Sequence, residues 1–345
     1  MKTMISNLYI DLLEEILSRV PVKSIGTVRS TCKNWNVLTK DQRFANKHIE
    51  KAAAASQLEK EVLVITGDPY YDLINVKFYD FHNKTFDPST KSNCILITQQ
   101  NLDSVVFVHS VFYCNGLLLC LLGNLKLRLL VWNPYWGKTR WINCPTKQRW
   151  YEMFAFGYNK SCGTHKILRL SSHDNIFIHI NMYDLSSDSW KTPDEAFNSN
   201  VIEYTKPGLS LKGNTYWYAY DKESRDGNVS LSSVKEEKLA LLKYLCGSEV
   251  TVWVTDKIEP DDVLWSKLFK VETLLFNRGY LFESLLIDEE NKTVVAFDDY
   301  DTCCNTNAYI IDGESGNFRK VDLIESPYSR LYNLVTNYVP SSVHI

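Results

Sequence analysis

The chain has 345 residues, of which 45% are hydrophobic and 13% aromatic, so it can bury a large core. Its formal net charge of −3 is unevenly distributed, because Lys and Arg outnumber Asp and Glu by four in residues 1–60, which leaves −7 for the rest. This distribution argues against a general nucleic-acid surface, since duplex binding needs clustered positive charge.

The cysteines and the apolar runs indicate a compartment. Nine cysteines occur singly apart from Cys303-Cys304, a distribution that does not suggest a disulfide framework. Acidic residues from Asp11 onward interrupt the first apolar segment, so we expect no secretory signal. No run approaches about 18 uncharged apolar residues, so we expect no membrane-spanning helix. These features favour the cytoplasm or the nucleus.

The first predicted element is an amphipathic helix close to the start of the chain. Apolar side chains recur at the i, i+3, i+4 and i+7 positions of a helix, namely Leu13, Ile16, Leu17 and Val20. Pro21 ends this helix, because proline has no amide hydrogen and clashes with the preceding turn.

Two further short helices are expected in this first module, residues 1–50. One restarts near Lys23, and one begins near Thr31 and carries Cys32, Trp35 and Leu38 on one side. A domain of about fifty residues buries only about 60% of its unfolded surface, which is too little for a robust independent core. We therefore expect the module to rely on a partner.

The order of residues in this module resembles the F-box closely. The matching positions are Leu8, Asp11-Leu12-Leu13, Glu15-Ile16-Leu17-Ser18-Arg19-Val20-Pro21, Lys23-Ser24, Val28-Arg29, Thr31-Cys32-Lys33, Trp35, Asp41, Phe44 and Lys47-His48. The resemblance implies docking on the Skp-type adaptor, and through it on cullin, in a ubiquitin ligase for which this chain recruits a target protein. The side chains expected at the adaptor are Leu8, Leu12, Ile16, Leu17, Pro21, Val28, Cys32 and Trp35, of which Trp35 is also partly core.

One position departs from the F-box pattern. The family usually opens its first helix with Leu-Pro, whereas Leu8 is followed here by Tyr9. Proline at the first helical position is pre-set for helical φ and gives up only an amide that is unpaired in any case. The exchange predicts weaker adaptor binding than a Leu-Pro version of this chain would have.

The spacing of apolar residues along the sequence changes after the module. Residues 51–60 contain strong helix formers and are expected to extend the last helix as a stiff connector. Short apolar or alternating runs then predict a mainly β body over residues 61–340. The expected strands cover residues 62–66, 76–81, 117–122, 127–132, 176–183, 215–220, 250–254, 285–288, 294–297 and 309–312. For residues 234–245 a helix and a charged hairpin remain alternatives.

A weak repeat runs through these strands, in which Asp or Asn follows one strand and an aromatic residue opens the next. Its copies run from Asp80 to Phe86, from Asn133 to Trp141, from Asp184 to Trp190 and from Asp312 to Phe318. The first three copies stand 53 and 51 residues apart, which is close to one four-stranded propeller blade. We expect the Asp or Asn to accept hydrogen bonds from turn amides and the aromatic ring to pack between blades.

The body resembles the type 1 F-box associated domain of plant F-box proteins. The matching segments are Cys114-Asn-Gly-Leu-Leu-Leu-Cys120, Val131-Trp-Asn-Pro-Tyr135, Thr139-Arg-Trp141, Phe156-Gly-Tyr158, His165-Lys-Ile167, Tyr183-Asp184, Ser189-Trp190, Leu211-Lys-Gly-Asn-Thr-Tyr-Trp217, Trp253-Val-Thr255 and Trp265. The resemblance implies a kelch-like β-propeller that binds the target. Chain length and repeat period give about six blades. The expected fold is therefore mainly β, with an F-box three-helix unit before the propeller.

Signatures of catalysis, metals and cofactors are missing from the sequence. It has no phosphate-binding loop, nucleophile elbow or zinc-protease helix, and Cys114 and Cys120 lie in an apolar run where a thiol is expected to be inert. His109, His173 and His179 lack the tight pairs of a zinc site. We expect a non-catalytic ligase subunit without a cofactor. The alternatives are a binding module outside a ligase and a ligand sensor or enzyme built on the propeller.

Overall fold

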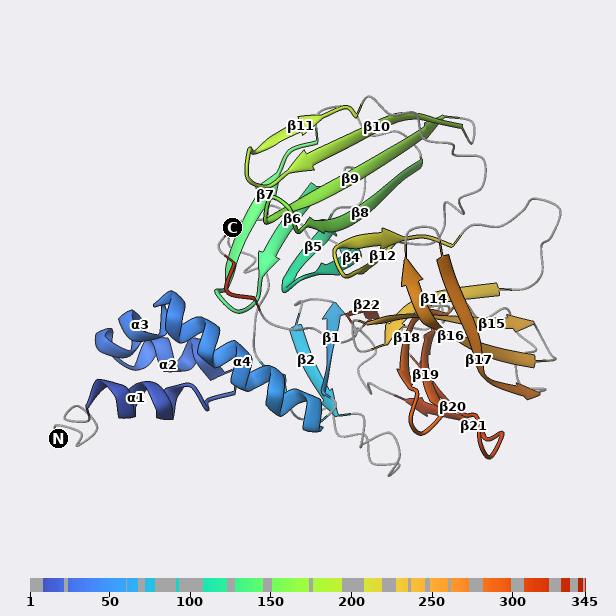
Figure 1. Ribbon diagram of the computed structural model, residues 1–345, viewed down its shortest axis with the longest axis horizontal. Helices are drawn as coiled ribbons and strands as arrows, with labels where there is room; N and C mark the ends of the chain where they lie inside the picture. Colours follow the sequence, from blue (N-terminus) through green and yellow to red (C-terminus); the bar gives the residue numbers. More distant parts are fainter. Residues whose placement is uncertain are drawn as a thin grey trace.

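The computed structural model places a group of helices at one end of the molecule and strands through the rest of it (Figure 1). The residues that it describes are 9–21, 24–59, 61–67, 72–77, 91–92, 108–122, 128–144, 151–173, 176–193, 208–218, 228–234, 237–245, 249–259, 262–272, 282–298, 307–322, 330–335, 341–343 and 345.

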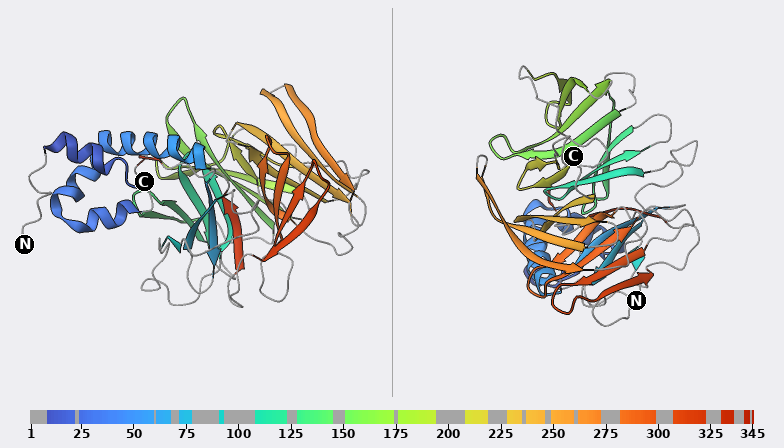
Figure 2. Two further views of the ribbon diagram at one scale, coloured as in Figure 1. Left: turned by 90° about the horizontal axis from the view of Figure 1, so that it is seen from below. Right: turned by 90° about the vertical axis from the view of Figure 1, so that its right-hand side faces the viewer.

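The N-terminal module contains three short helices and a long one, although Thr31 ends the second helix and Cys32 lies before the third helix and not on it. They are α1 (Ile10–Leu17), α2 (Ile25–Thr31), α3 (Lys33–Thr39) and α4 (Gln42–Glu59). Pro21 lies between α1 and α2, where its missing amide costs no helical hydrogen bond. The Asp41 side chain caps α4 by accepting from the amides of Arg43 and Phe44. α4 then runs for 18 residues towards the β body (Figure 2).

One apolar cluster holds the module together. Leu17, Ile25 and Phe44, from α1, α2 and α4, are buried in it. Half-buried side chains pack against them, namely Leu13, Val20, Val28, Trp35 and Leu38. A core with three fully buried apolar side chains is small, as expected for a module that relies on further contacts.

The described strands of the body form six antiparallel sheets, five with four strands and one with two. In order of pairing, the first three sheets are β22 (Arg330–Val335), β1 (Glu61–Gly67), β2 (Asp72–Lys77) and β3 (Lys91–Ser92); β4 (Val108–Cys114), β5 (Leu117–Leu122), β6 (Arg128–Asn133) and β7 (Lys138–Ile142); and β8 (Tyr151–Asn159), β9 (Thr164–His173), β10 (Ile176–Asp184) and β11 (Ser189–Lys191). The other three are β12 (Leu209–Leu211) and β13 (Asn214–Tyr216); β14 (Asn228–Val234), β15 (Lys238–Leu245), β16 (Glu249–Glu259) and β17 (Asp262–Glu272); and β18 (Phe282–Asp288), β19 (Thr293–Asp298), β20 (Asn307–Asp312) and β21 (Phe318–Asp322).

These sheets are arranged as the blades of a propeller. The first strand of each sheet meets its neighbours: β22 contacts β4 and β18, β4 contacts β8, and β14 contacts β18 and β12. β22 also pairs with β1, so strands from both ends of the body share one sheet. Complete four-stranded blades number five among the described residues, against the expected count of about six. The two-stranded sheet contacts both β8 and β14.

The apolar core lies between neighbouring sheets. One cluster joins β4–β7 to β8–β11 through side chains such as Leu119, Phe156 and Tyr183. A second joins β14–β17 to β18–β21 through Val252 and Phe282 among others. β5 is buried along its whole length, because both of its faces are covered.

The strand predictions hold for most of the described segments. Residues 117–122 form β5 with the expected bounds, and residues 234–245 form a hairpin, in which β14 ends at Val234 and β15 follows. The expected strand at 215–220 is shorter, since β13 ends at Tyr216. The one at 76–81 overlaps β2 only as far as Lys77, and the remainder lies outside the described residues.

The turns after three strands confirm the role expected for Asp and Asn. Oδ1 of Asn133 accepts hydrogen bonds from the amides two and three positions further on. Asp184 and Asp312 do the same in their own turns. The copy that begins at Asp80 lies outside the described residues. A short polar side chain after a strand thus satisfies turn amides at each described copy.

The aromatic partners of the repeat behave less uniformly. Trp190 packs on Tyr183 and donates from Nε1 to the Asn143 carbonyl oxygen of the neighbouring blade, as expected for a ring between blades. Phe318 stacks on Tyr309 of its own sheet. Trp141 is exposed, with the Arg128 guanidinium over its ring.

Candidate partner-binding site

The outer side of α1 carries a strip of large apolar side chains. Tyr9, Ile10, Leu12 and Ile16 are 82%, 66%, 53% and 53% exposed, and we call these four residues the α1 strip. Eight large hydrophobic side chains are exposed among the described residues, so half of them gather in this short segment. A concentration of exposed apolar surface is typical of a protein interaction site.

The structure separates the eight residues that the sequence assigned to the adaptor. Leu12 and Ile16 belong to the α1 strip, and Pro21 and Cys32 are also exposed. Leu17 lies in the module's core with 2% exposure, so its side chain packs inside the module and not on its surface. Val28 and Trp35 are half-buried against the same core, and Leu8 lies outside the described residues.

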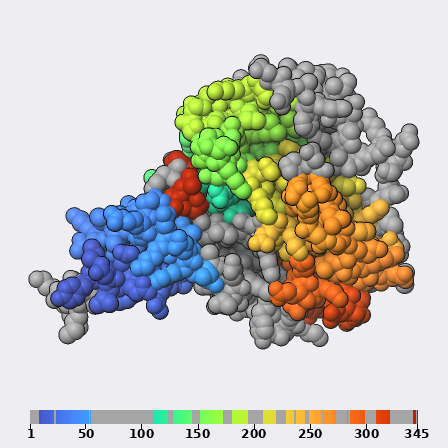
Figure 3. Space-filling model, in the orientation of Figure 1, coloured from blue at the N-terminus to red at the C-terminus, as the bar shows by residue number. Residues whose placement is uncertain are grey.

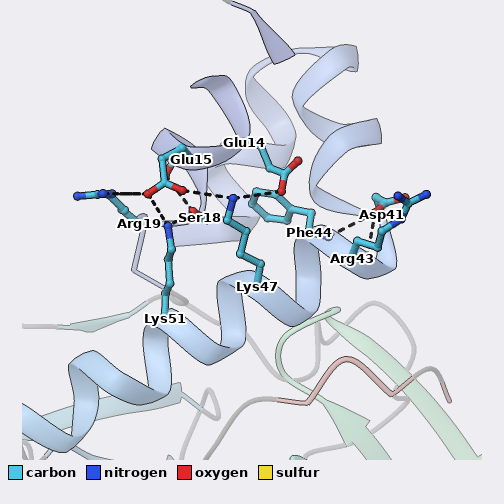
Figure 4. A network of polar contacts seen from close by, with 9 residues as sticks. All are labelled: Glu14, Glu15, Ser18, Arg19, Asp41, Arg43, Phe44, Lys47 and Lys51. Carbon is cyan, nitrogen blue, oxygen red and sulfur yellow. Dashed lines mark hydrogen bonds and ion pairs between the residues drawn. The ribbon is translucent and has the colours of Figure 1, made fainter. Parts of the chain in front are cut away.

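Ionic contacts hold α1 against α4 (Figure 4). Glu15 Oε1 lies 2.6 Å from Lys51 Nζ and 2.8 Å from Arg19 Nη2, and Oε2 lies 3.2 Å from Lys47 Nζ. Lys51, Arg19 and Lys47 together lower the pKa of Glu15 to about 2. Because these groups are largely exposed, the network contributes little to the stability of the fold.

A second cluster joins the helical module to the β4–β7 sheet at the turn between β6 and β7. Arg29 of α2 donates from Nη1 to the Tyr135 carbonyl oxygen at 2.7 Å, and from Nη2 to the Thr39 carbonyl oxygen at 3.3 Å. Its Cζ lies 4.7 Å from the centre of the Trp136 ring, a cation–π distance. Burial lowers the pKa of Arg29, but a guanidinium remains charged in proteins.

His48 of α4 reaches the same turn. Its Nε2 lies 2.6 Å from the Val20 carbonyl oxygen, so Nε2 carries the hydrogen and donates it. Nδ1 then accepts from the Tyr135 hydroxyl at 3.1 Å. Burial lowers the pKa of His48 and raises the pKa of Tyr135 to about 12, so both groups are neutral at physiological pH.

Residues 341–343 and 345, which we call the C-terminal segment, lie where the module meets this sheet. Asn133 Nδ2 donates to the carbonyl oxygens of Ser341 and Val343 at 3.0 and 2.7 Å. On the other side, Ser342 Oγ donates to Asn46 Oδ1 of α4 at 2.7 Å. Figure 3 shows the segment in red between the blue helical module and the green sheet.

Arg29, His48, the Tyr135 turn and the C-terminal segment form the junction between the helical module and the β4–β7 sheet. Sequence analysis did not identify this junction. Arg29, His48 and Tyr135 each stand in a segment that resembles a known motif, but Tyr135 is 106 residues from Arg29 and 87 from His48. No local period pairs residues that far apart. The signal present in the sequence was Asn133, an amide where three other copies of the repeat have Asp.

The two cysteines weighed as nucleophiles are core residues. Cys114 and Cys120 are buried, and burial raises the pKa of Cys120 to about 12, so it stays a thiol at neutral pH. In the described part of the chain, no three His, Cys, Asp or Glu side chains gather where they could hold a metal ion. The side chains of His109, His173 and His179 are not among those described. No helix among the described residues has the length and hydropathy needed to cross a membrane.

Comparison with known proteins matches both parts of the chain. Residues 5–47 match the F-box domain, and residues 69–229 and 221–345 match the F-box associated β-propeller domain, which confirms both resemblances. The F-box protein At3g20690 of Arabidopsis thaliana is 41% identical, and the match covers 99% of this chain and 100% of that protein. The putative F-box/kelch-repeat protein At3g20710 of the same plant is 39% identical over 97% of this chain and 99% of its own.

A solved β-propeller domain, Cps50 (Swd1) of Myceliophteria thermophila, is much more distant. It has 10% sequence identity and a TM-score of 0.34 over 62% of this chain and 86% of its own. A likeness at that level carries no argument about fold or function. The full-length matches to plant proteins are the informative ones.

Proposed function

The chain belongs to the F-box proteins with an F-box associated β-propeller domain, and from this membership we propose that it is the substrate-recognition subunit of a Skp–cullin–F-box ubiquitin ligase. The helical module binds the Skp-type adaptor, which connects the chain to cullin, and the propeller holds the target protein. A separate conjugating enzyme transfers ubiquitin to a lysine of the target, in the cytoplasm or the nucleus.

The contribution of this chain to the reaction is proximity. Binding the target and the ligase at once turns an encounter in bulk solution into an intramolecular one at high effective concentration. Such a role needs no catalytic side chain of its own. It does need two separate binding surfaces and a defined geometry between them.

The α1 strip is the observation that supports the adaptor contact. Leu12 and Ile16 lie on one helical face, four residues apart, and keep half of their surface exposed in a module with a small core. Burial of one such side chain against a partner contributes about 1.5–3 kcal/mol. We place the contact on the strip together with Pro21 and Cys32, and assign to Leu17 the supporting role that its burial gives it.

Titration of the full-length chain with a Skp-type adaptor tests this placement. Changing Leu12→Asp and Ile16→Asp together should weaken binding at least about a hundredfold, since each tenfold corresponds to about 1.4 kcal/mol. Leu264→Asp is the matched control, because Leu264 is 56% exposed on β17, in the propeller. Adaptor affinity that survives the double change, with the module still helical by circular dichroism, would overturn the proposal.

A further inference from the structure

Asn133 differs by one atom from the residues that cap the equivalent turns. Asp184 and Asp312 accept hydrogen bonds from their turn amides through Oδ1. Asn133 uses its Oδ1 in the same way, towards the amides of Tyr135 and Trp136. Its second polar atom is a donor where aspartate would have another acceptor. That donor is the amide nitrogen that bonds the C-terminal segment.

We propose that Asn133 is a positioning residue that latches the C-terminal segment into the junction and thereby fixes the direction of the helical module relative to the propeller. One buried side chain then performs two tasks. Its oxygen shapes the turn that meets Arg29 and His48, and its nitrogen holds the segment. Aspartate could perform only the first task.

The segment contacts both parts that it would join. On the propeller side, Trp136 Nε1 donates to the Ser342 carbonyl oxygen at 3.1 Å, and Val343 and Ile345 pack against the apolar cluster between two blades. On the module side, Ser342 Oγ bonds Asn46 of α4. Contacts on opposite sides of a short segment resist rotation of one part against the other.

The segment is also closely packed against the turn between β4 and β5. Gly116 has φ of +81°, and a Cβ at that position would come within 2.0 Å of the Ser341 Cβ atom. Only glycine leaves room for the backbone of the segment to lie there. The place of the segment is therefore set by close packing as well as by the bonds from Asn133.

The functional role of this latch rests on the proposed function. A fixed orientation of the helical module relative to the propeller matters where a target must be held at a set distance from the conjugating enzyme. A module free to swing would spread the target over a larger volume and lower its effective concentration. The existence of the latch can be tested without any partner.

The distance between the two parts gives the test. Non-natural residues that carry spin labels replace exposed Val37 of α3 and exposed Leu264 of β17. Pulsed electron paramagnetic resonance then measures the distance between the two labels in the full chain. Asn133→Asp keeps the oxygen that accepts from the turn amides. It replaces the donor nitrogen by a second carboxylate oxygen, which would face the carbonyl oxygens of Ser341 and Val343 without a hydrogen between them. We expect it to broaden the distance distribution at least about twofold. The opposite exchange Asp184→Asn, at a carboxylate that accepts its hydrogen bonds within its own turn, should leave the distribution narrow.

Deletion of residues 341–345 supplies an independent variant should Asn133→Asp fail to fold. The deletion should broaden the distribution as much as Asn133→Asp does, and the two changes together should broaden it no further. A narrow distribution in either folded variant, or further broadening in the combination, overturns the latch. Adaptor affinity plays no part in this measurement, so failure of the latch and failure of the ligase assignment are distinguishable.

Discussion

His48 Nδ1 on α4 and the hydroxyl of Tyr135 in the β6–β7 turn lie 3.1 Å apart, although 87 residues separate them in the chain. The same turn receives the Arg29 guanidinium from α2. The helical module and the propeller therefore meet through buried polar contacts at one turn. The α4 helix is one part of their connection, and this junction is the other.

Tyr135→Phe should destabilise the full chain by about 1–3 kcal/mol. The change removes the donor to His48 Nδ1 and leaves that buried nitrogen without a partner, which is the costly way to lose a hydrogen bond. Chemical denaturation of the full chain measures the effect. Tyr9→Phe, which removes an exposed hydroxyl, should stay within about 0.5 kcal/mol of the wild type. Equal stability of the Tyr135→Phe chain would show that the bond contributes nothing.

Stability should fall as the pH drops from about 6.5 to about 4. Burial lowers the pKa of His165 to about 4, so in this range the unfolded chain binds the proton more readily than the folded one. At about 1.36 kcal/mol per pKa unit the loss is about 3 kcal/mol by pH 4. The lowered pKa of His48 adds to the loss in the same direction.

Denaturation curves at pH values between 4 and 7 check this expectation. His165→Gln should reduce the pH dependence, because the variant has no imidazole at position 165, and the remaining dependence includes that of His48. Glu15 affects the pH dependence only below about 4.5, because its stabilising contribution is present above its ordinary pKa of 4.5 and is lost as the pH falls towards about 2. A wild-type chain whose stability is constant from pH 7 to pH 4 would contradict the assignment.

Tyr9→Pro should tighten adaptor binding about two- to fivefold. Tyr9 is the N-cap of α1, directly before its first residue, and not the first helical position expected from the sequence. Its φ is −56° and its carbonyl oxygen accepts the first helical amides. That φ suits proline, and a compatible proline lowers the conformational entropy of the unfolded chain, which stabilises the folded form by about 0.4–1 kcal/mol. Tyr9→Ala, which removes the exposed ring without adding proline, is the control in the titration. Proline that binds no better than alanine would remove the reason to regard Tyr9 as a weakness.

Arg169→Met should destabilise the propeller by about 3–5 kcal/mol. Arg169 and Glu152 form an ion pair across β9 and β8, with 1% and 3% of their side chains exposed, so the change leaves a buried carboxylate without its cation. Glu152→Met in the same chain should restore much of the loss, because two apolar side chains can replace a buried pair. Thermal unfolding measures both. Strictly additive effects would show that the two residues do not act as a pair.

Local patterns in the sequence predicted most of the described strands and the turns after them. The apolar run at residues 117–122 and the Asp184 turn depend on neighbours within a few positions, so their structure could be predicted. The apolar pattern of α1 did not show that Leu12 is exposed and Leu17 is buried. α1 is apolar on two sides, and a helical period does not state which side meets the core.

The junction was beyond local reasoning for a different physical reason. Asn133 and Ser341 are 208 residues apart, and their contact exists only because β6 and the C-terminal segment meet in the folded chain. Arg29 was a matching position of the F-box pattern, which names no partner for its side chain. Distant polar groups pair only once the chain has folded, so the local spacing of residues in the sequence does not predict these pairs.

The most direct measurement of the central claim is hydrogen exchange of the full chain with and without a saturating Skp-type adaptor. We expect the amides of residues 9–17 to exchange at least about tenfold more slowly in the complex, because the α1 strip is covered, while the propeller strands keep their rates. Exchange that is unchanged in α1, or slowed only in the propeller, would contradict the assignment of this surface to ligase assembly.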